Sequence, residues 1–369
     1  MSTYVELRAK SFYSFGEGAS HVHELLTRAA DLGYPAFALT DTNLCGAHEF
    51  AKQANQMGVR PITGGQITLN DGSHITLLAR SRQGYAHLSR LFTLANFQDR
   101  QDPRLDPAHL PEHGEGLILI TGYTDSAISR LLQEEGHADQ AANLLGQYVE
   151  WFGQEHVYLG LQQNRMYGDT TRNRRLVKLA RRCGVPLVTT NDVHYHLPER
   201  HKLQNVLTAI RNNRTLDEAI HDLKLSPEFY LKSPAQMERL FSECPEALRN
   251  TIHIAEACQF NLASDLGYQL PVPSVPGGYT TETYLQRLSQ EAAMRRYGRL
   301  PERVKQRLEE EFRLIRKHGL AGFLLLYREI ALIAHEVMVE GGRRPQETPI
   351  EMWPPWRSRG SSVALLVGY

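Results

Sequence analysis

Cysteine is scarce in this 369-residue chain, and the four that occur, Cys45, Cys183, Cys244 and Cys258, are far apart. No two of them form a C-x-x-C pair, which argues against a zinc ribbon and against a disulfide framework. Cysteines spaced in this way fit a reducing compartment. We therefore expect a cytoplasmic protein.

The chain also lacks an excess of charge of either sign, because Lys plus Arg and Asp plus Glu both number 41. A strongly basic protein that coats nucleic acid is not supported, so any nucleic-acid site must be local. The first ten residues contain no apolar stretch of the kind found in a signal peptide. The longest apolar run, residues 320–339, is interrupted by charged side chains and predicts an amphipathic helix, so we expect no membrane role.

Three familiar catalytic motifs are missing as well. The chain has no G-x-x-x-x-G-K-[ST] loop, no G-x-S-x-G elbow and no H-E-x-x-H helix. The missing motifs therefore argue against three classes of enzyme, which are P-loop NTPases, serine hydrolases and zincins.

What the first 200 residues do contain is an alternation of short β-rich runs and helical patterns. Helices are expected at residues 21–32, with Ser20 as N-cap, and at residues 170–182, which stop at Gly184. Continuous apolar runs are typical of strands buried on both faces, so the alternation predicts a mainly parallel sheet or barrel. The expected strands are residues 36–40, 59–69, 75–79, 117–121, 157–161 and 186–190.

The pattern becomes helical after residue 200, with a short extended piece at 229–231. A cluster of Pro and Gly at residues 271–278 marks a stiff junction, where we place the domain boundary. Beyond it, helices are expected at residues 281–297, 301–317 and 322–339.

Polar residues that follow apolar strands are the first candidates for chemistry, because strand ends share a cavity in an α/β barrel. Asp192, His194 and His196 follow the last expected strand, and residues two apart project to one face of an extended segment. Imidazole and carboxylate suit Zn, Mn or Fe ions. The spacing leaves two interpretations open, which are a metal site and a hydrogen-bonded structural cluster.

A second candidate is the turn formed by Arg359, Gly360 and Ser361. Backbone N–H groups, a hydroxyl and a guanidinium could together bind a triphosphate, although a plain surface turn has the same composition.

Several stretches taken together resemble the N-terminal region of bacterial DNA polymerase III alpha subunits, which are C-family DNA polymerases. They continue in that family's order through Gly322 and Arg359, so the resemblance covers almost the whole chain. It implies an N-terminal polymerase-and-histidinol-phosphatase (PHP) domain at residues 1–270, with a distorted (β/α)7 barrel, and a mostly helical, incomplete polymerase palm at residues 271–369. The stretches are YVEL at 4–7, SFGEGAS at 14–20, LTD at 39–41, GVRPI at 58–62, TNDVHYH at 190–196 and EFYLKS at 228–233.

An active PHP barrel holds three metal ions, and this sequence departs from that ligand pattern. The resemblance places Arg8 and Lys10 where the first two histidines would be. Cations there would repel metal ions, so we expect a vestigial, structural site without bound Zn or Mn. We also expect Arg8 to pair with Asp192 or Glu17. The other departures are Thr42, Gln66 and Tyr123, and the residues left of the metal site are Glu17, His74, Asp192 and His194.

The second half departs from the family's pattern because it lacks the expected aspartates. The family's two-metal chemistry needs aspartates in the palm, and the last aspartate here is Asp265. The resemblance implies Mg²⁺, DNA and dNTPs for the full-length polymerase, with other polymerase subunits as further partners, whereas the chain as given should not polymerise DNA.

Two alternatives compete with this hypothesis. One is a metal-dependent PHP phosphoesterase or 3′ to 5′ proofreading exonuclease that uses Asp192, His194 and His74. The other is a non-enzymatic interaction module. Bound metal would favour the first, and a stable fold with neither metal nor activity would favour the second.

Overall fold

A computed structural model describes residues 4–134, 136–267, 270, 272–343 and 367. The chain divides into two compact units, Met1–Leu266 and Gly267–Tyr369. In the described residues, no helix combines the length and apolar character that crossing a membrane requires.

The first unit is built on a curled sheet of six strands in sequence order. The six expected strands are confirmed, with ends that shift by one or two residues, because each is an apolar run bounded by turn residues. The strands are β1 (Ala36–Leu39), β2 (Arg60–Thr68), β3 (His74–Ala79), β4 (Leu117–Thr121), β5 (Val157–Leu161) and β6 (Leu187–Thr189).

The sheet is less parallel than the sequence predicts. β1 pairs with β2 in parallel, and β4, β5 and β6 are parallel to one another, but β3 is antiparallel to both of its neighbours. The short link between β2 and β3 is the reason, because a parallel pair needs a long crossover. Gly72, at φ 74°, provides the left-handed position in that turn.

Residues 4–10 connect the two edges of the sheet. On one side, the N–H of Ala38 in β1 donates to the carbonyl of Glu6 at 3.0 Å. On the other side, the N–H of Lys10 donates to the carbonyl of Val193 at 2.8 Å. This segment therefore occupies the position of a further strand in the PHP-type barrel that the sequence predicts.

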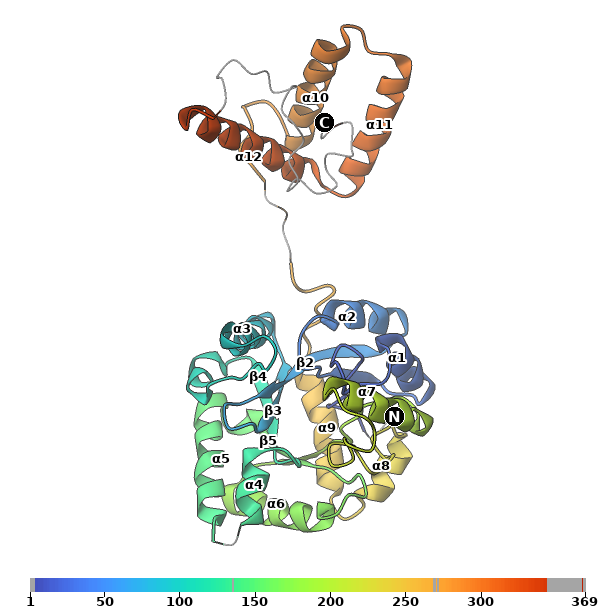
Figure 1. Ribbon diagram of the computed structural model, residues 1–369, viewed down its shortest axis with the longest axis vertical. Helices are drawn as coiled ribbons and strands as arrows, with labels where there is room; N and C mark the ends of the chain where they lie inside the picture. Colours follow the sequence, from blue (N-terminus) through green and yellow to red (C-terminus); the bar gives the residue numbers. More distant parts are fainter. Residues whose placement is uncertain (1–3, 135, 268–269, 271, 344–366, 368–369) are drawn as a thin grey trace. The chain divides into compact units, whose positions relative to one another are not determined.

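Nine helices of the first unit are described, and most of them pack on the outer face of the sheet (Figure 1). Ile254 and Ala255 of α9, with Cys258 directly after the helix, belong to the same buried apolar cluster as Leu7 and Ile120. The helices are α1 (Val22–Asp31), α2 (Ala47–Gln56), α3 (Arg82–Gln98), α4 (Ala127–Gln133), α5 (Ala138–Phe152), α6 (Asp169–Cys183), α7 (His201–Arg211), α8 (Pro234–Leu240) and α9 (Pro245–Ala257).

The expected N-cap of α1 is wrong by one residue. His21 is the N-cap, and its N–H donates to the Glu24 carboxylate at 2.9 Å. The Ser20 hydroxyl is used elsewhere, since it lies 2.7 Å from His196 Nδ1. The end of α6 is as predicted, with Gly184 in the left-handed conformation at φ 66°.

The second unit contains the three expected helices, α10 (Thr281–Tyr297), α11 (Glu302–Lys317) and α12 (Ala321–Glu340). They share a small apolar core that includes Leu285, Ile315 and Leu324. The assignment of residues 271–369 to a polymerase palm stays a prediction. The candidate nucleotide-binding residues Arg359, Gly360 and Ser361 lie outside the described residues.

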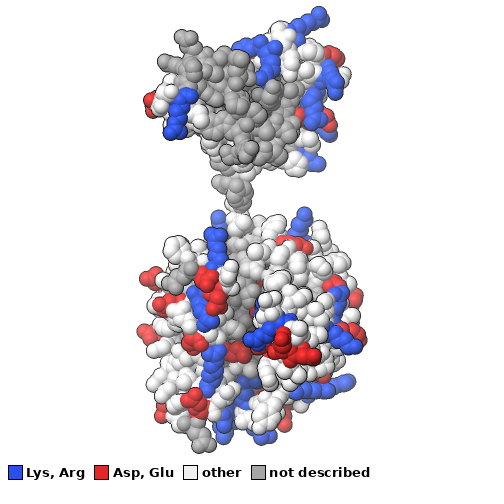
Figure 2. All heavy atoms as spheres, in the orientation of Figure 1, with Lys and Arg blue, Asp and Glu red and all other residues white. Residues whose placement is uncertain are grey.

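Acidic and basic side chains are mixed over the face of the first unit that Figure 2 shows. This mixing agrees with the equal numbers of the two kinds in the sequence.

Candidate functional site

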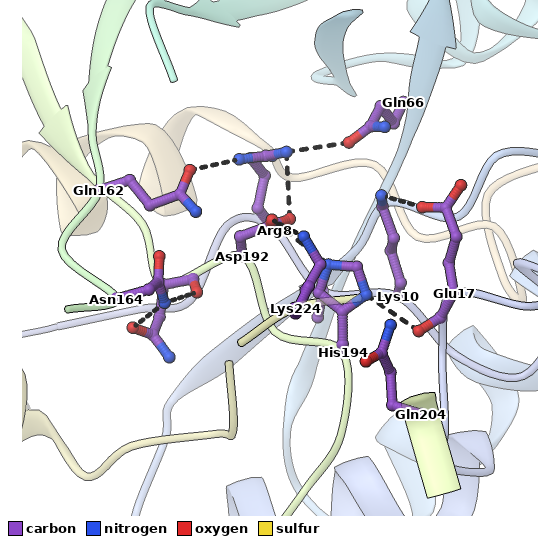
Figure 3. Close-up of polar contacts among 12 residues, drawn as sticks. Arg8, Lys10, Glu17, Gln66, Gln162, Asn164, Asp192, His194, Gln204 and Lys224 are labelled. Carbon is purple, nitrogen blue, oxygen red and sulfur yellow. Dashed lines mark hydrogen bonds and ion pairs between the residues drawn. The ribbon is translucent and has the colours of Figure 1, made fainter. Parts of the chain in front are cut away.

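The candidate site lies where the N-terminal segment passes the ends of β2, β5 and β6 (Figure 3). Gln66 lies near the end of β2, Gln162 directly follows β5, and Asp192 and His194 come shortly after β6. Strands that end at one edge of a sheet bring such residues together. Arg8 reaches into the same place from the N-terminal segment.

The side chain of Arg8 is only 3% exposed, and its guanidinium group is fully surrounded by partners. Its Nη2 lies 3.1 Å from Asp192 Oδ1 and donates to Gln66 Oε1 at 2.9 Å. Its Nη1 donates to Gln162 Oε1 at 3.4 Å, and the group stacks over the Tyr123 ring at 3.5 Å from the centroid. The expectation that Arg8 pairs with Asp192 is confirmed.

Glu17 does not pair with Arg8, so that alternative is wrong. It forms an ion pair with Lys10, and Arg211 Nη1 donates to its other carboxylate oxygen at 2.8 Å. Burial raises the pKa of Glu17, but Lys10 and Arg211 outweigh it and hold that pKa well below its usual range. The backbone turn at Glu17 and Gly18 is tightly packed, since a Cβ on Gly18 would lie 2.0 Å from the Ser11 carbonyl oxygen.

Asp192 and His194 lie side by side, as their spacing predicts. Asp192 Oδ2 is 3.3 Å from His194 Nε2 and 3.8 Å from Lys224 Nζ. Burial opposes the ionisation of Asp192, but Arg8, and to a smaller extent Lys224, lower its pKa well below the usual value. Asp192 is held at φ 50°, a conformation that costs energy for a residue with a side chain.

His194 is neutral near pH 7, because burial and the nearby Lys224 lower its pKa. Its Nδ1 lies 2.9 Å from the carbonyl oxygen of Glu17, and since a carbonyl can only accept, Nδ1 carries the proton. Its Nε2 then carries a lone pair that lies on the side of Asp192, and no described residue donates a hydrogen bond to this nitrogen. The ammonium of Lys224 is the neighbouring group with a charge that suits both the lone pair and the carboxylate (Figure 3).

His74 joins the site indirectly, through Gln66. The Gln66 amide nitrogen lies 3.3 Å from His74 Nδ1, while the amide oxygen of Gln66 accepts from Arg8. Burial, followed by the charge of Lys10, lowers the pKa of His74 to about 4, so this imidazole is also neutral. All four residues expected from the metal site thus belong to one network.

The network does not fit a metal ion. The carboxylate groups of Glu17 and Asp192 already have cationic side chains as partners, and metal ligation would require displacing them. Within the described part of the chain, no three His, Cys, Asp or Glu side chains are grouped so that they could hold a metal.

Sequence reasoning missed four members of the network, which are Glu6, Gln162, Lys224 and Arg211. Gln162 follows a strand and could have been found by the rule that identified Asp192. Glu6 is a lone acid in an apolar run, and it accepts hydrogen bonds from the Tyr4 hydroxyl and from backbone N–H groups. Burial raises the pKa of Glu6 to about 7. No signal in the sequence indicates Lys224 or Arg211.

Comparisons with known proteins agree with the sequence and the geometry. Residues 6–164 match the family described as PHP domain. An error-prone DNA polymerase of Symbiobacterium thermophilum is 35% identical over 353 residues, which are 90% of this chain and 32% of that protein. Another error-prone DNA polymerase, from Mycolicibacterium paratuberculosis, is 34% identical over 350 residues, with 90% and 32% covered. The chain thus spans about a third of the length of these curated relatives.

Solved structures also match this chain, and one of them is described here. It is a two-domain protein from Bacteroides vulgatus, described as containing a predicted PHP-like metal-dependent phosphoesterase. It is 13% identical to this chain, with a TM-score of 0.35 and 52% of each chain covered.

Proposed function

The chain contains a PHP domain and is homologous to error-prone DNA polymerases, and on this premise we propose that it is the N-terminal part of a polymerase that copies DNA with low fidelity. The whole protein would be of the DNA polymerase III alpha type. DNA and dNTPs would be its substrates, Mg²⁺ its catalytic ion, and the cytoplasm its location. Other polymerase subunits are proposed as partners. The names of the relatives favour the error-prone role over the replicative one.

We further propose that the PHP unit is a structural support for the polymerase and not a hydrolase. One observation carries this proposal, namely the Arg8 guanidinium held among Asp192, Gln66 and Gln162. PHP domains belong to a metal-dependent family. Here the positive charge of Arg8 is paired with the Asp192 carboxylate, which a metal ion would need as a ligand. Coulomb repulsion between Arg8 and a divalent ion at such short range disfavours metal binding.

Lys10 and Lys224 support the same conclusion. Lys10 neutralises Glu17, and Lys224 approaches the Asp192 and His194 pair from the segment that follows α7. Together with Arg8, these cations supply within the chain the positive charge that a metal cluster would otherwise supply. The barrel is held closed by ion pairs between segments far apart in the sequence.

The first experiment measures metal content by elemental analysis in the full chain purified without chelator. Phosphodiester hydrolysis is assayed in parallel with added Mn²⁺ or Zn²⁺. We expect no stoichiometric metal and no hydrolysis. Two or three tightly bound ions, with hydrolysis that is lost in Asp192→Asn, would overturn the structural role and support the phosphoesterase alternative.

A triple variant is the matched positive control. Arg8→His, Lys10→His and Gln66→Glu restore the ligand types that the family resemblance implies at these positions. If the cations exclude metal, this variant takes up Zn²⁺ or Mn²⁺ while the unaltered chain does not. Circular dichroism checks that both are folded. Equal metal uptake by the two proteins contradicts the proposed exclusion.

Primer extension tests the polymerase proposal separately. The longest product of the reading frame is assayed on a primed template with dNTPs and Mg²⁺, and the 369-residue chain is the control. The control has no aspartate after Asp265 and is expected to be inactive. A longer product that folds and cannot extend a primer would contradict the polymerase role.

A further inference from the structure

A separate cavity of about 400 Å³ lies at the opposite edge of the barrel from the cationic network. Arg80, which directly follows β3, lines it together with residues that precede β5 and β6. The backbone N–H of Arg80 donates to the Gly116 carbonyl just before β4, which places the side chain at the N-terminal ends of β4, β5 and β6. The cavity therefore shares no residue with the site described above.

Arg80 carries the strongest indication of a ligand. Its side-chain Nε is buried and has no hydrogen-bond partner among the described residues. No carboxylate of the described residues lies within ion-pair distance of it, although Glu155 also lines the cavity. An arginine that lines a cavity and has no described ion-pair partner is suited to bind an anion there through its terminal nitrogens.

The remaining walls restrict what that anion can be. Tyr158, Ile118 and Pro186 form an apolar and aromatic wall. Two further polar side chains of the lining can accept hydrogen bonds from the ligand. Glu155 offers a carboxylate, and His156 donates its Nδ1 proton to the Phe152 carbonyl, which leaves Nε2 as an acceptor.

We propose that this cavity binds a nucleoside monophosphate. Its phosphate would contact the Arg80 guanidinium, and its base would lie against the ring of Tyr158 with amino groups directed to Glu155 and His156. The volume is within the usual range for small-molecule sites. Arg80 is the sole Lys or Arg among the described lining residues, and Glu155 would repel further negative charge, so a monophosphate fits better than a triphosphate.

The site is independent of the polymerase proposal, because its residues belong to the PHP unit and do not touch the cationic network. It is tested by isothermal titration calorimetry on the full chain with dAMP as the probe. Deoxyadenosine, inorganic phosphate and dATP are compared with it. We expect saturable dAMP binding, and binding at least about tenfold weaker for each of the other three.

Two variants assign the binding to the cavity. Arg80→Gln should weaken dAMP binding by about tenfold or more, because a charge-assisted contact to phosphate is lost. Arg82→Gln is the matched control, since Arg82 is exposed two residues away and does not line the cavity, and it should leave binding unchanged. Tyr158→Leu should weaken dAMP binding but leave inorganic phosphate unaffected.

Several results would overturn the proposal. These are unchanged dAMP affinity in a folded Arg80→Gln variant, inorganic phosphate that binds as tightly as dAMP, and dATP that binds more tightly than dAMP. Absence of saturable dAMP binding to the folded chain would also overturn it. Thermal unfolding followed by circular dichroism establishes the folded state of each variant.

Discussion

Arg8 and Arg80 lie at opposite edges of the same barrel and are used in opposite ways. Arg8 is 3% exposed and has a carboxylate, two amide oxygens and an aromatic ring as partners. Arg80 faces a cavity, and its Nε has no partner among the residues described. One guanidinium is therefore part of the structure, and the other is the one that we propose binds a ligand.

The difference suggests where to look for a ligand in this unit. At the edge that holds Arg8, internal ion pairs join the charged side chains to one another. A buried cation costs several kcal/mol unless it is paired, so complete pairing marks a structural role. An unpaired group beside a cavity marks a binding role.

The largest expected effect is the difference in stability between a variant without the Arg8 guanidinium and one without the Arg80 guanidinium. Arg8→Met leaves Asp192 buried without its main counter-ion, and we expect a loss of about 3–5 kcal/mol in the free energy of unfolding. Arg80→Met removes no described side-chain hydrogen bond or ion pair and should change that free energy by less than about 0.5 kcal/mol. Urea denaturation measures both. Similar losses in the two variants would remove the contrast between the edges.

The pH dependence of stability offers a second test of the filled edge. The pKa of Glu6 is raised from 4.5 to about 7 by burial, so the folded state keeps its proton to higher pH than the unfolded state does. The free energy of unfolding must therefore fall as pH rises from about 4.5 to 7, by about 3 kcal/mol from this group.

Glu6→Gln should remove that decrease while leaving the other titrations in place. Urea denaturation of both proteins at pH 5 and pH 7.5 gives the comparison, and a constant offset between them does not affect it. A decrease that is the same in both proteins would show that Glu6 does not titrate in this window.

A smaller effect is expected for the second ion pair of the network. Glu17 is 23% exposed, so its pairing with Lys10 is partly screened by solvent. Glu17→Gln should lower the free energy of unfolding by about 2 kcal/mol, between the values for buried and surface pairs. It should not alter dAMP affinity at the opposite edge. A loss as large as that of Arg8→Met would mean that the two pairs are equally important to the fold.

The smallest effect is stabilisation by ligand at the open edge. At a dAMP concentration of ten times Kd, binding to the folded state alone should add about 1.4 kcal/mol to the free energy of unfolding. Added Zn²⁺ should give no such increase, because the filled edge has no place for it. Thermal shift assays with dAMP, Zn²⁺ and a chelator distinguish the two ligands. Stabilisation by Zn²⁺ that a chelator reverses would contradict the assignment of the two edges.

Much of the fold could be predicted from the sequence, because its elements depend on short-range patterns. Apolar runs located all six strands, and helical sequence patterns beyond the Pro and Gly cluster located α10, α11 and α12. The reversed direction of β3 was not predicted, since it depends on the length of a turn. The cap of α1 was missed because Ser20 is recruited by His196, a residue far along the chain.

The candidate site was predictable only in part. The family resemblance indicated that Arg8 and Lys10 replace metal ligands, and it led to the expected pairing of Arg8 with Asp192. Lys224 and Arg211 could not be foreseen, because loops and helix α7 bring them in from distant parts of the sequence.

The sequence by itself determined which segments are strands and helices, because local patterns of residue type require nothing from distant parts of the chain. Only the tertiary structure decided that Arg8 is satisfied and Arg80 is not. The reason is that a charge is neutralised by whatever the fold brings within a few ångströms, and Asp192, 184 positions after Arg8 along the sequence, lies 3.1 Å from it in space.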